Sequence, residues 1–259
     1  VDMRFQSEAD FKERCGYDVD DSWYPRVTKI IEIKAKPALY KFYGELNSFA
    51  EGEAIKEQSA SEGTLIHETF EKILLGQKPE ISSSILPAMK AASRFLQEHQ
   101  LRVHPEYVER RISHKLHRYA GTIDALAILD GKLGVLDIKT SQSIYRDYNL
   151  QTAAYLEALR AQFSNLETRW ILRIDQVKRC QVCGSVLRSK GGRDKVRSPF
   201  PLPPGWQKCA DDSHQWLELT GVVELKEFPS WQDDFEAFLS AKRLWEWEND
   251  YWLRRIGYL

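Results

Sequence analysis

The sequence predicts a mixed α/β protein in which helices flank a central mixed sheet. Apolar residues recur at helical spacing from Ser61 to Gly76 and again over about residues 84–100. Between residues 107 and 139 the pattern changes to an alternation that is rich in β-forming residues. A helical segment over 147–162 and a strand over 167–175 complete the order helix–β–β–β–helix–β, which is typical of mixed α/β folds.

The alternating region divides into three strands, because the pair Asp130-Gly131 marks a tight turn between the second and the third. These strands are expected over about 107–114, 119–129 and 132–139. A further strand is predicted over 216–228, and an amphipathic helix follows it.

We expect the chain to contain three parts. Residues 1–60 form an N-terminal helical arm, residues 61–175 and 216–259 form the core, and residues 176–215 form a Cys-containing, basic insertion. A structureless loop as long as this insertion is uncommon inside a compact domain, so we expect something to organise it.

Charge and composition limit the class of protein. The 259 residues include 37 basic and 38 acidic ones, so the net charge of −1 does not by itself indicate a nucleic-acid binder. No apolar run approaches the roughly 18–20 residues of a membrane span, and the charged N-terminal segment lacks a signal-peptide core. We therefore expect a cytoplasmic protein with no membrane partner, in which the four cysteines are free thiols or metal ligands.

Two acidic residues lie on the strands that flank the Asp130-Gly131 turn. A two-residue turn there places Asp124 opposite Asp137, with Cβ atoms about 4.5–5.5 Å apart. Like charges in such a pair destabilise a sheet unless a cation lies between them. The pair therefore suits a divalent metal ion such as Mg²⁺ or Mn²⁺.

Lys139 lies two residues beyond Asp137, so both side chains are expected on the same face of the strand. A lysine at a metal site can hold or polarise an attacking water, or neutralise charge that builds up on a phosphate. The alternative is a solvated strand face with a cross-strand cluster of charges, since short motifs match by chance often.

Five sequence features occur together in one order. GTID is followed thirteen residues later by LDIKT, and a helix with Gln151-x-x-x-Tyr155 comes next. Upstream are GTLIHETFE, which contains His67, and PRVTKIIEIKAKPALYKFY. Together they resemble the PD-(D/E)XK nuclease superfamily, and within it the RecB-like or phage-type exonuclease branch with a Q-x-x-x-Y motif. The resemblance covers about residues 25–175 and the later strand, and implies a restriction-endonuclease-like core.

The resemblance implies a role for each matching residue. Asp124 and Asp137 would be metal ligands, the Ile138 carbonyl a third ligand, and His67 an additional ligand from its helix. Lys139 would be the catalytic lysine.

The resemblance implies roles for three further residues. Gln151 and Tyr155 share one helix face and would position the lysine, the scissile phosphate or the DNA. Glu109 would reach a second metal ion or a water molecule. A surface ion pair with Arg110 or Arg111 is the alternative for this glutamate.

By the same resemblance, the protein would be a Mg²⁺- or Mn²⁺-dependent deoxyribonuclease that acts as an exonuclease on DNA with free ends, in phage or bacterial recombination or repair. An endonuclease with the same site, and a nuclease-like module that binds DNA without cutting it, are the alternatives. A helicase or a single-strand annealing protein would be its partner by analogy.

The insertion carries a second candidate metal site. Cys180-x-x-Cys183 is followed by Gly184, and Cys209 with His214 completes a Cys₃His set for Zn²⁺. An iron–sulfur cluster on Cys15, Cys180, Cys183 and Cys209 is a rival, because some RecB-like nucleases bind one through four cysteines. The absence of any bound metal is the third alternative.

Basic and aromatic residues indicate candidate DNA-binding surfaces. Residues 177–197 of the insertion are rich in positive charge against a single acid, Asp194, so this stretch either contacts phosphates or forms a solvated loop. The basic residues are Lys178, Arg179, Arg188, Lys190, Arg193, Lys195 and Arg197. The final helix carries Trp231, Trp245, Trp247 and Trp252, for which we expect packing on the core rather than stacking on bases.

Overall fold

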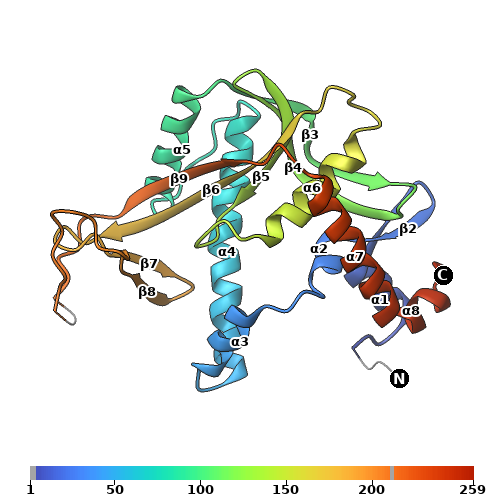
Figure 1. The fold of residues 1–259 in the computed structure, drawn as a ribbon, viewed down its shortest axis with the longest axis horizontal. Coiled ribbons are helices and arrows are strands. Elements are labelled where there is room, and N and C mark those ends of the chain that lie inside the picture. The colour runs from blue at the N-terminus through green and yellow to red at the C-terminus, as the bar shows by residue number, and fades with distance from the viewer. Residues whose placement is uncertain (1–3, 211–212) are drawn as a thin grey trace.

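The computed structural model describes residues 4–210 and 213–259, and its centre is one mixed sheet (Figure 1). The central strands are β3 (Leu101–His114), β4 (Tyr119–Leu129), β5 (Lys132–Lys139), β6 (Thr168–Arg179) and β9 (Thr220–Glu227). β3, β4 and β5 pair antiparallel, β5 pairs parallel with β6, and β9 pairs antiparallel with the other edge of β6. The prediction of a mixed α/β fold with a central mixed sheet is confirmed.

Helices α4 (Phe49–Leu74) and α5 (Leu86–Glu98) cover one face of the sheet. Ile66, Phe70 and Met89 from these helices pack against Leu136 and Ile138 of β5 in one buried apolar cluster. Figure 1 shows α4 running across the strand direction and projecting past the sheet toward α3 (Pro37–Gly44).

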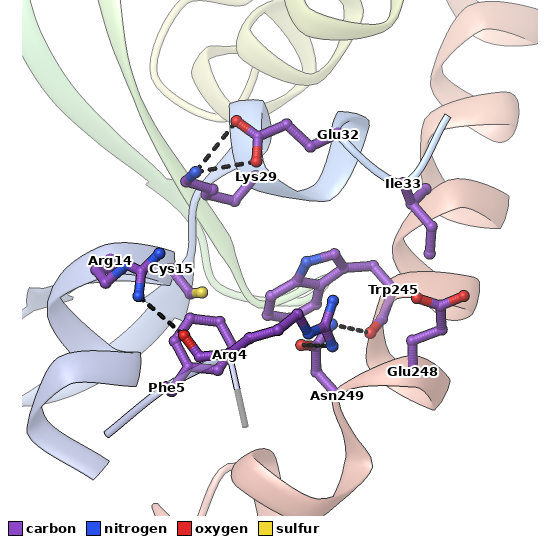
Figure 2. Close-up of a pocket in the computed structure, with 10 residues that line it drawn as sticks. All are labelled: Arg4, Phe5, Arg14, Cys15, Lys29, Glu32, Ile33, Trp245, Glu248 and Asn249. Atoms are coloured by element: carbon purple, nitrogen blue, oxygen red, sulfur yellow. Dashed lines mark hydrogen bonds and ion pairs between the residues drawn. The ribbon is translucent and has the colours of Figure 1, made fainter. Parts of the chain in front are cut away.

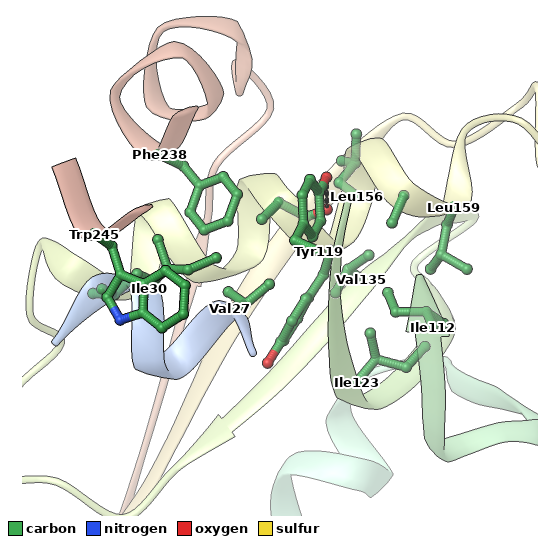
Figure 3. Close-up of a cluster of buried hydrophobic side chains, with 14 of the residues drawn as sticks. Val27, Ile30, Ile112, Tyr119, Ile123, Val135, Leu156, Leu159, Phe238 and Trp245 are labelled. Atoms are coloured by element: carbon green, nitrogen blue, oxygen red, sulfur yellow. Dashed lines mark hydrogen bonds between the residues drawn. The ribbon is translucent and has the colours of Figure 1, made fainter. Parts of the chain in front are cut away.

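Helices from three distant parts of the chain cover the other face. They are α2 (Val27–Ile31), α6 (Asp147–Leu159) and α7 (Gln232–Glu248). Figure 3 shows Val27, Leu156 and Phe238 from these helices around Val135 of β5, in a second buried cluster. Because Val135 and Leu136 belong to different clusters, β5 alternates between the two faces as a central strand should.

The N-terminal residues pack beside the end of the chain. They form α1 (Glu8–Cys15), a hairpin of β1 (Gly16–Val19) and β2 (Ser22–Pro25), and then α2. The buried ring of Phe11 stacks on Trp252 in α8 (Asp250–Arg255), with ring centroids 5.9 Å apart. The division of the chain into an arm, a core and an insertion stays a prediction.

Several element boundaries agree with the predicted ones and others do not. β4 and β5 span the predicted residues, whereas α4 begins at Phe49 rather than Ser61. The Ser48 hydroxyl caps α4 by accepting a hydrogen bond from the Glu51 amide. The first half of α4 is largely exposed, so it lacks the apolar spacing that marks the second half.

The segment over 176–215 contains a hairpin of β7 (Val186–Lys190) and β8 (Arg193–Arg197). β7 pairs with the end of β6 at Lys178 and Arg179, past the point where β6 pairs with β5. Since β9 occupies the opposite edge of β6, the hairpin lies on the β5 side, just beyond the end of β5. Among the described residues, no helix combines the length and apolar character needed to cross a membrane.

Candidate active site

The end of β5 holds a buried ion pair. Asp137 is fully buried, and the Lys139 Nζ lies 2.7 Å from its Oδ2. Both residues lie on the α6 side of the sheet, as the period of two in a strand requires. Tyr148 of α6 supplies an aromatic face 5.1 Å from the Lys139 Nζ. Sequence reasoning missed this tyrosine, because only the folded position of α6 brings it there.

Asp124 lies where the β4–β5 ladder stops. The predicted register is confirmed through Ala125 opposite Leu136, one position short of Asp124 and Asp137. Beyond that point, Asp124 Oδ2 accepts a hydrogen bond of 2.5 Å from the Ile138 amide. The same oxygen lies 3.1 Å from Nε2 of His67 on α4. The carboxylate therefore ties the end of β5 to the helix on the other face.

His67 lies between two carboxylates. Its Nδ1 is 2.6 Å from Glu71 Oε1, one helical turn away, and its Nε2 faces Asp124. Burial alone would lower the pKa of His67, but the hydrogen bonds and charges of Asp124 and Glu71 raise it to about 10. Glu71 was not among the predicted site residues, although its spacing of four residues from His67 was the signal that could have identified it.

Glu109 completes a group of candidate metal ligands with His67 and Asp124. One ligand atom from each residue lies within 4.8 Å of the others. Glu109 has a positive φ of 50°, which is uncommon for a residue other than glycine and occurs often at functional sites. Partial desolvation by the surrounding protein, and then the hydrogen bond and charge of the neighbouring Glu71, raise the pKa of Glu109 to about 8. The rest of this glutamate is exposed, so the group faces solvent on the β3 side.

The two aspartates have different environments. Burial would raise the pKa of Asp124, but the hydrogen bond from His67 and the charge of Lys139 lower it. Burial raises the pKa of Asp137 to about 6, with the charge of Asp124 adding to the effect and Lys139 opposing it. The structure thus assembles His67, Glu109 and Asp124 as a group of candidate ligands, with Asp137 paired to Lys139.

Gln151 and Tyr155 approach the site from α6. The Gln151 Nε2 donates to Asp137 Oδ1 at 3.2 Å and to the Tyr155 hydroxyl at 3.2 Å. A Cβ atom on Gly121 would lie 2.3 Å from the Tyr155 ring, so only glycine leaves room for this ring. The predicted i, i+4 pair therefore meets, and Gln151 is the member that reaches the carboxylate.

The residues present fit a divalent cation. Glu71 Oε1 and Asp137 Oδ2 are buried, and each lies against a positively charged group, His67 at 2.6 Å and Lys139 at 2.7 Å. Carboxylates gathered this closely repel one another, and a bound cation would relieve that repulsion. A set of one imidazole and several carboxylates suits Mn²⁺ or Mg²⁺. Ile138, the predicted source of a third ligand, is held in place by the hydrogen bond that its amide donates to Asp124.

The predicted DNA-binding residues have mixed positions. Arg188 and Lys190 both donate to the Thr140 carbonyl, at 2.8 and 2.7 Å, rather than pointing to solvent. Arg193 pairs with Glu45 at 3.1 Å, and Arg197 donates to Ser143. The exposed members of this predicted set are Lys178, Arg179, Lys195 and Arg197.

Gly63 marks the point where α4, the end of β5 and the β7–β8 hairpin meet. A Cβ atom there would lie 2.5 Å from Thr140 Oγ1 and 3.2 Å from Lys190 Nζ. The three elements therefore approach more closely than any larger residue on α4 would allow. The hairpin, which sequence reasoning did not predict, is thus part of the wall beside the site.

The cysteines divide between two places. Cys180, Cys183 and Cys209 come together with His214, as the predicted zinc set requires. Cys15 instead packs in the apolar cluster with Phe11 and Trp23. The predicted iron–sulfur set with Cys15 is therefore wrong, because its four sulfurs do not form one group.

A cavity of about 530 Å³ lies at the other end of the molecule (Figure 2). It is lined by Cys15 of α1, Lys29 of α2 and Trp245 of α7, among others, and by none of the predicted catalytic residues. Trp245 and Trp252 are buried, whereas Trp247 is exposed. The expectation that the tryptophans pack on the core is thus confirmed for Trp231, Trp245 and Trp252 and is wrong for Trp247.

Comparisons with known proteins found likenesses among solved structures only. No protein-family model and no curated protein matches the chain. Among solved structures, it is similar to a putative exonuclease from Eubacterium rectale, with 11% identity and a TM-score of 0.40 over 100% of this chain and 87% of that one. It is also similar to LHK-Exo in complex with dAMP, with 15% identity and a TM-score of 0.30 over 75% and 84%. Likenesses at these identities and TM-scores carry no argument about function.

Proposed function

We propose that the protein is a divalent-metal-dependent deoxyribonuclease with the restriction-endonuclease-like core of the PD-(D/E)XK superfamily. The observation that carries the proposal is the convergence of Asp137 and Lys139 at the end of β5 with His67, Glu109 and Asp124 from three other elements. Carboxylates, one imidazole and one ammonium group in this arrangement suit hydrolysis of a phosphodiester.

His67, Glu109 and Asp124 would hold the ion, and Asp137, whose charge interacts with those of Asp124 and His67, would be a further ligand. When bound, Mg²⁺ or Mn²⁺ would polarise the scissile phosphate and lower the pKa of an attacking water. Water attacks phosphorus in line, the P–O bond to the leaving oxygen breaks, and that oxygen takes a proton.

Lys139 stabilises the negative charge that develops on the phosphate. Its ammonium group is buried against Asp137, and the charges of Asp137 and Asp124 raise its pKa against the opposing effect of burial. It therefore stays charged near neutral pH and acts as an electrostatic group rather than a base. Gln151 fixes the Asp137 carboxylate from the other side.

The substrate of the proposed enzyme is DNA with free ends, and its role is exonucleolytic processing in recombination or repair in a bacterial or phage-infected cytoplasm. Exposed Arg110 and Arg111 follow Glu109 on β3, and Lys178, Arg179 and Lys195 are exposed near the hairpin. Such cations bind phosphates without reading sequence. A helicase or a single-strand annealing protein is the proposed partner.

The test uses linear and covalently closed circular DNA with Mg²⁺ or Mn²⁺. We expect linear DNA to be degraded from its ends and circular DNA to stay intact. Cleavage of circles would instead establish an endonuclease with the same site. Binding of both forms without cleavage would overturn the proposal in favour of a non-cleaving DNA-binding module.

Two lysine variants on β5 test the role proposed for Lys139 in cleavage. Lys139→Ala should lose cleavage, whereas Lys132→Ala should retain it, because Lys132 lies at the opposite end of β5 in a surface pair with Glu227. Circular dichroism should show both proteins folded, with Lys139→Ala the less stable one, because it leaves Asp137 buried without its positively charged partner. Equal activity of the two variants would contradict the assigned role of Lys139.

A further inference from the structure

Two separate segments bring four metal-binding side chains together beyond the end of β6. Cys180 and Cys183 come from the turn that follows β6, and Cys209 and His214 come from the segment before β9. One ligand atom from each of the four lies within 4.8 Å of the others. Cys180 and Cys183 are buried, so these thiols point into the turn rather than to solvent.

The distances among these atoms fit a tetrahedral ion. Zinc–sulfur bonds of about 2.3 Å at tetrahedral angles place two sulfurs about 3.8 Å apart, and a sulfur about 3.6 Å from a ring nitrogen. The Cys180 and Cys209 sulfurs are 3.7 Å apart, and the Cys183 sulfur is 3.3 Å from His214 Nδ1. A disulfide needs a sulfur–sulfur distance of about 2.05 Å, so Cys180 and Cys209 are not bonded to each other.

The backbone around the cysteines is shaped as a tight knuckle. The Gly184 amide donates to the Cys180 carbonyl at 3.0 Å, and the Cys180 amide donates to the Ser185 carbonyl at 2.8 Å. Gly184 has a φ of +69°, and a Cβ atom there would lie 2.9 Å from the Trp206 ring. The turn therefore requires glycine directly after the second cysteine.

The second pair of ligands is held against this knuckle by backbone pairing. The Gln181 amide donates to the Gln215 carbonyl at 3.0 Å, and the Leu217 amide donates to the Arg179 carbonyl at 2.8 Å. Cys180 and Trp216 form an isolated antiparallel bridge. The two ligand pairs are thus fixed relative to each other by hydrogen bonds on both sides.

We propose that Cys180, Cys183, Cys209 and His214 bind one structural zinc ion. Three thiolates and one imidazole fill all four tetrahedral positions, which leaves none for water or substrate, so the site is structural rather than catalytic. Soft thiolate ligands select zinc over Mg²⁺ and Mn²⁺, which the carboxylates near His67 prefer. The proposal does not rest on the proposed nuclease function.

The zinc site fixes the base of the β7–β8 hairpin. β7 begins at Val186, directly after the knuckle, and its Arg188 and Lys190 hold the carbonyl of Thr140, the residue after Lys139. Arg188 also pairs with the buried Asp175 at 2.6 Å. At the hairpin tip, the Gly191 amide donates to Glu62 on α4. Zinc therefore supports the loop beside Lys139 without touching it.

The test is metal analysis of the purified full chain, followed by cobalt substitution. We expect about one zinc per chain, and visible bands of Co²⁺ in a tetrahedral thiolate site after exchange. Cys209→Ser and His214→Ala should each lower the zinc content and alter the cobalt spectrum. The control is Cys15→Ala, which changes a cysteine outside the group and should keep both readouts.

Hydrogen exchange over residues 186–197 tests the supporting role. We expect faster exchange there after zinc removal, while residues 119–139 stay protected. Bound iron with sulfide, or no metal binding even after reduction and reconstitution with zinc, would overturn the proposal. Each of these results stands whether or not the protein cleaves DNA.

Discussion

Asp124 Oδ2 contacts both the Ile138 amide, at 2.5 Å, and the His67 ring, at 3.1 Å. One carboxylate oxygen thus links β5, which carries Asp137 and Lys139, to the helix that carries a candidate metal ligand. The ladder between β4 and β5 ends where this contact begins, so the side chain replaces a backbone pair. Asp124 is therefore expected to affect both the metal site and the end of β5.

Asp124→Asn should weaken metal binding by at least about tenfold. The asparagine side chain can still accept the hydrogen bond from the Ile138 amide, but it lacks the negative charge that attracts the metal ion. Calorimetric titration with Mn²⁺ measures the change. Asp130→Asn is the matched control, since Asp130 is an exposed acid in the turn between the same two strands. Equal affinity of both variants would remove Asp124 from the ligand set.

Metal binding should release between one and two protons near neutral pH. The pKa of His67 in the free protein is raised to about 10 and that of Glu109 to about 8, so both groups carry a proton at neutral pH, whereas a metal ion binds the neutral ring and the ionised carboxylate. Apparent affinity should therefore rise by at least about tenfold per pH unit as pH increases toward the pKa of His67.

Titrations in two buffers of different ionisation enthalpy measure the proton count. His67→Gln should release fewer protons, because no imidazole remains to titrate. A binding enthalpy that is independent of the buffer in the unaltered protein would contradict a metal role for His67.

Gln151→Ala and Tyr155→Phe should not act independently. The Tyr155 hydroxyl accepts from Gln151, which donates to Asp137, so the tyrosine acts through the glutamine. We expect a coupling of about 1 kcal/mol, or about fivefold in kcat, in a double-mutant cycle. KM should change little. Additive effects of the two substitutions would show that the tyrosine only packs.

Gly121→Ala should destabilise the protein by about 1–3 kcal/mol, because the new methyl group would lie 2.3 Å from the buried Tyr155 ring. Gly44→Ala is the control, since nothing lies within 4 Å of a Cβ atom at that helical position. Urea unfolding measures both. A free energy of unfolding for Gly121→Ala that equals that of Gly44→Ala would show that α6 shifts without cost.

The sequence predicted those parts of the fold that are determined by local pattern. Asp130-Gly131 set the register of β4 and β5, and the period of two placed Lys139 beside Asp137. The first half of α4 could not be predicted from apolar spacing, because it makes few contacts with the core. The helix begins at the Ser48 cap, which lies well before the apolar spacing of its second half.

The details of the site depend on long-range packing that no local pattern records. Cys15 precedes the histidine helix in sequence, yet it packs far from the other cysteines. Arg188 and Lys190 looked like DNA contacts because charge in a sequence carries no direction, and the fold turns both toward Thr140. Tyr148 faces Lys139 only because α6 packs beside the end of β5.

Gly63 lies one helical turn before His67, and its contacts with Thr140 and Lys190 leave no space for a methyl group. A rotation or slide of α4 that displaced His67 would therefore press on the loop after Lys139 and on the hairpin at the same time. The ligand on the helix and the lysine on the strand are therefore mechanically coupled through this contact, whereas the side of Glu109 is exposed to solvent.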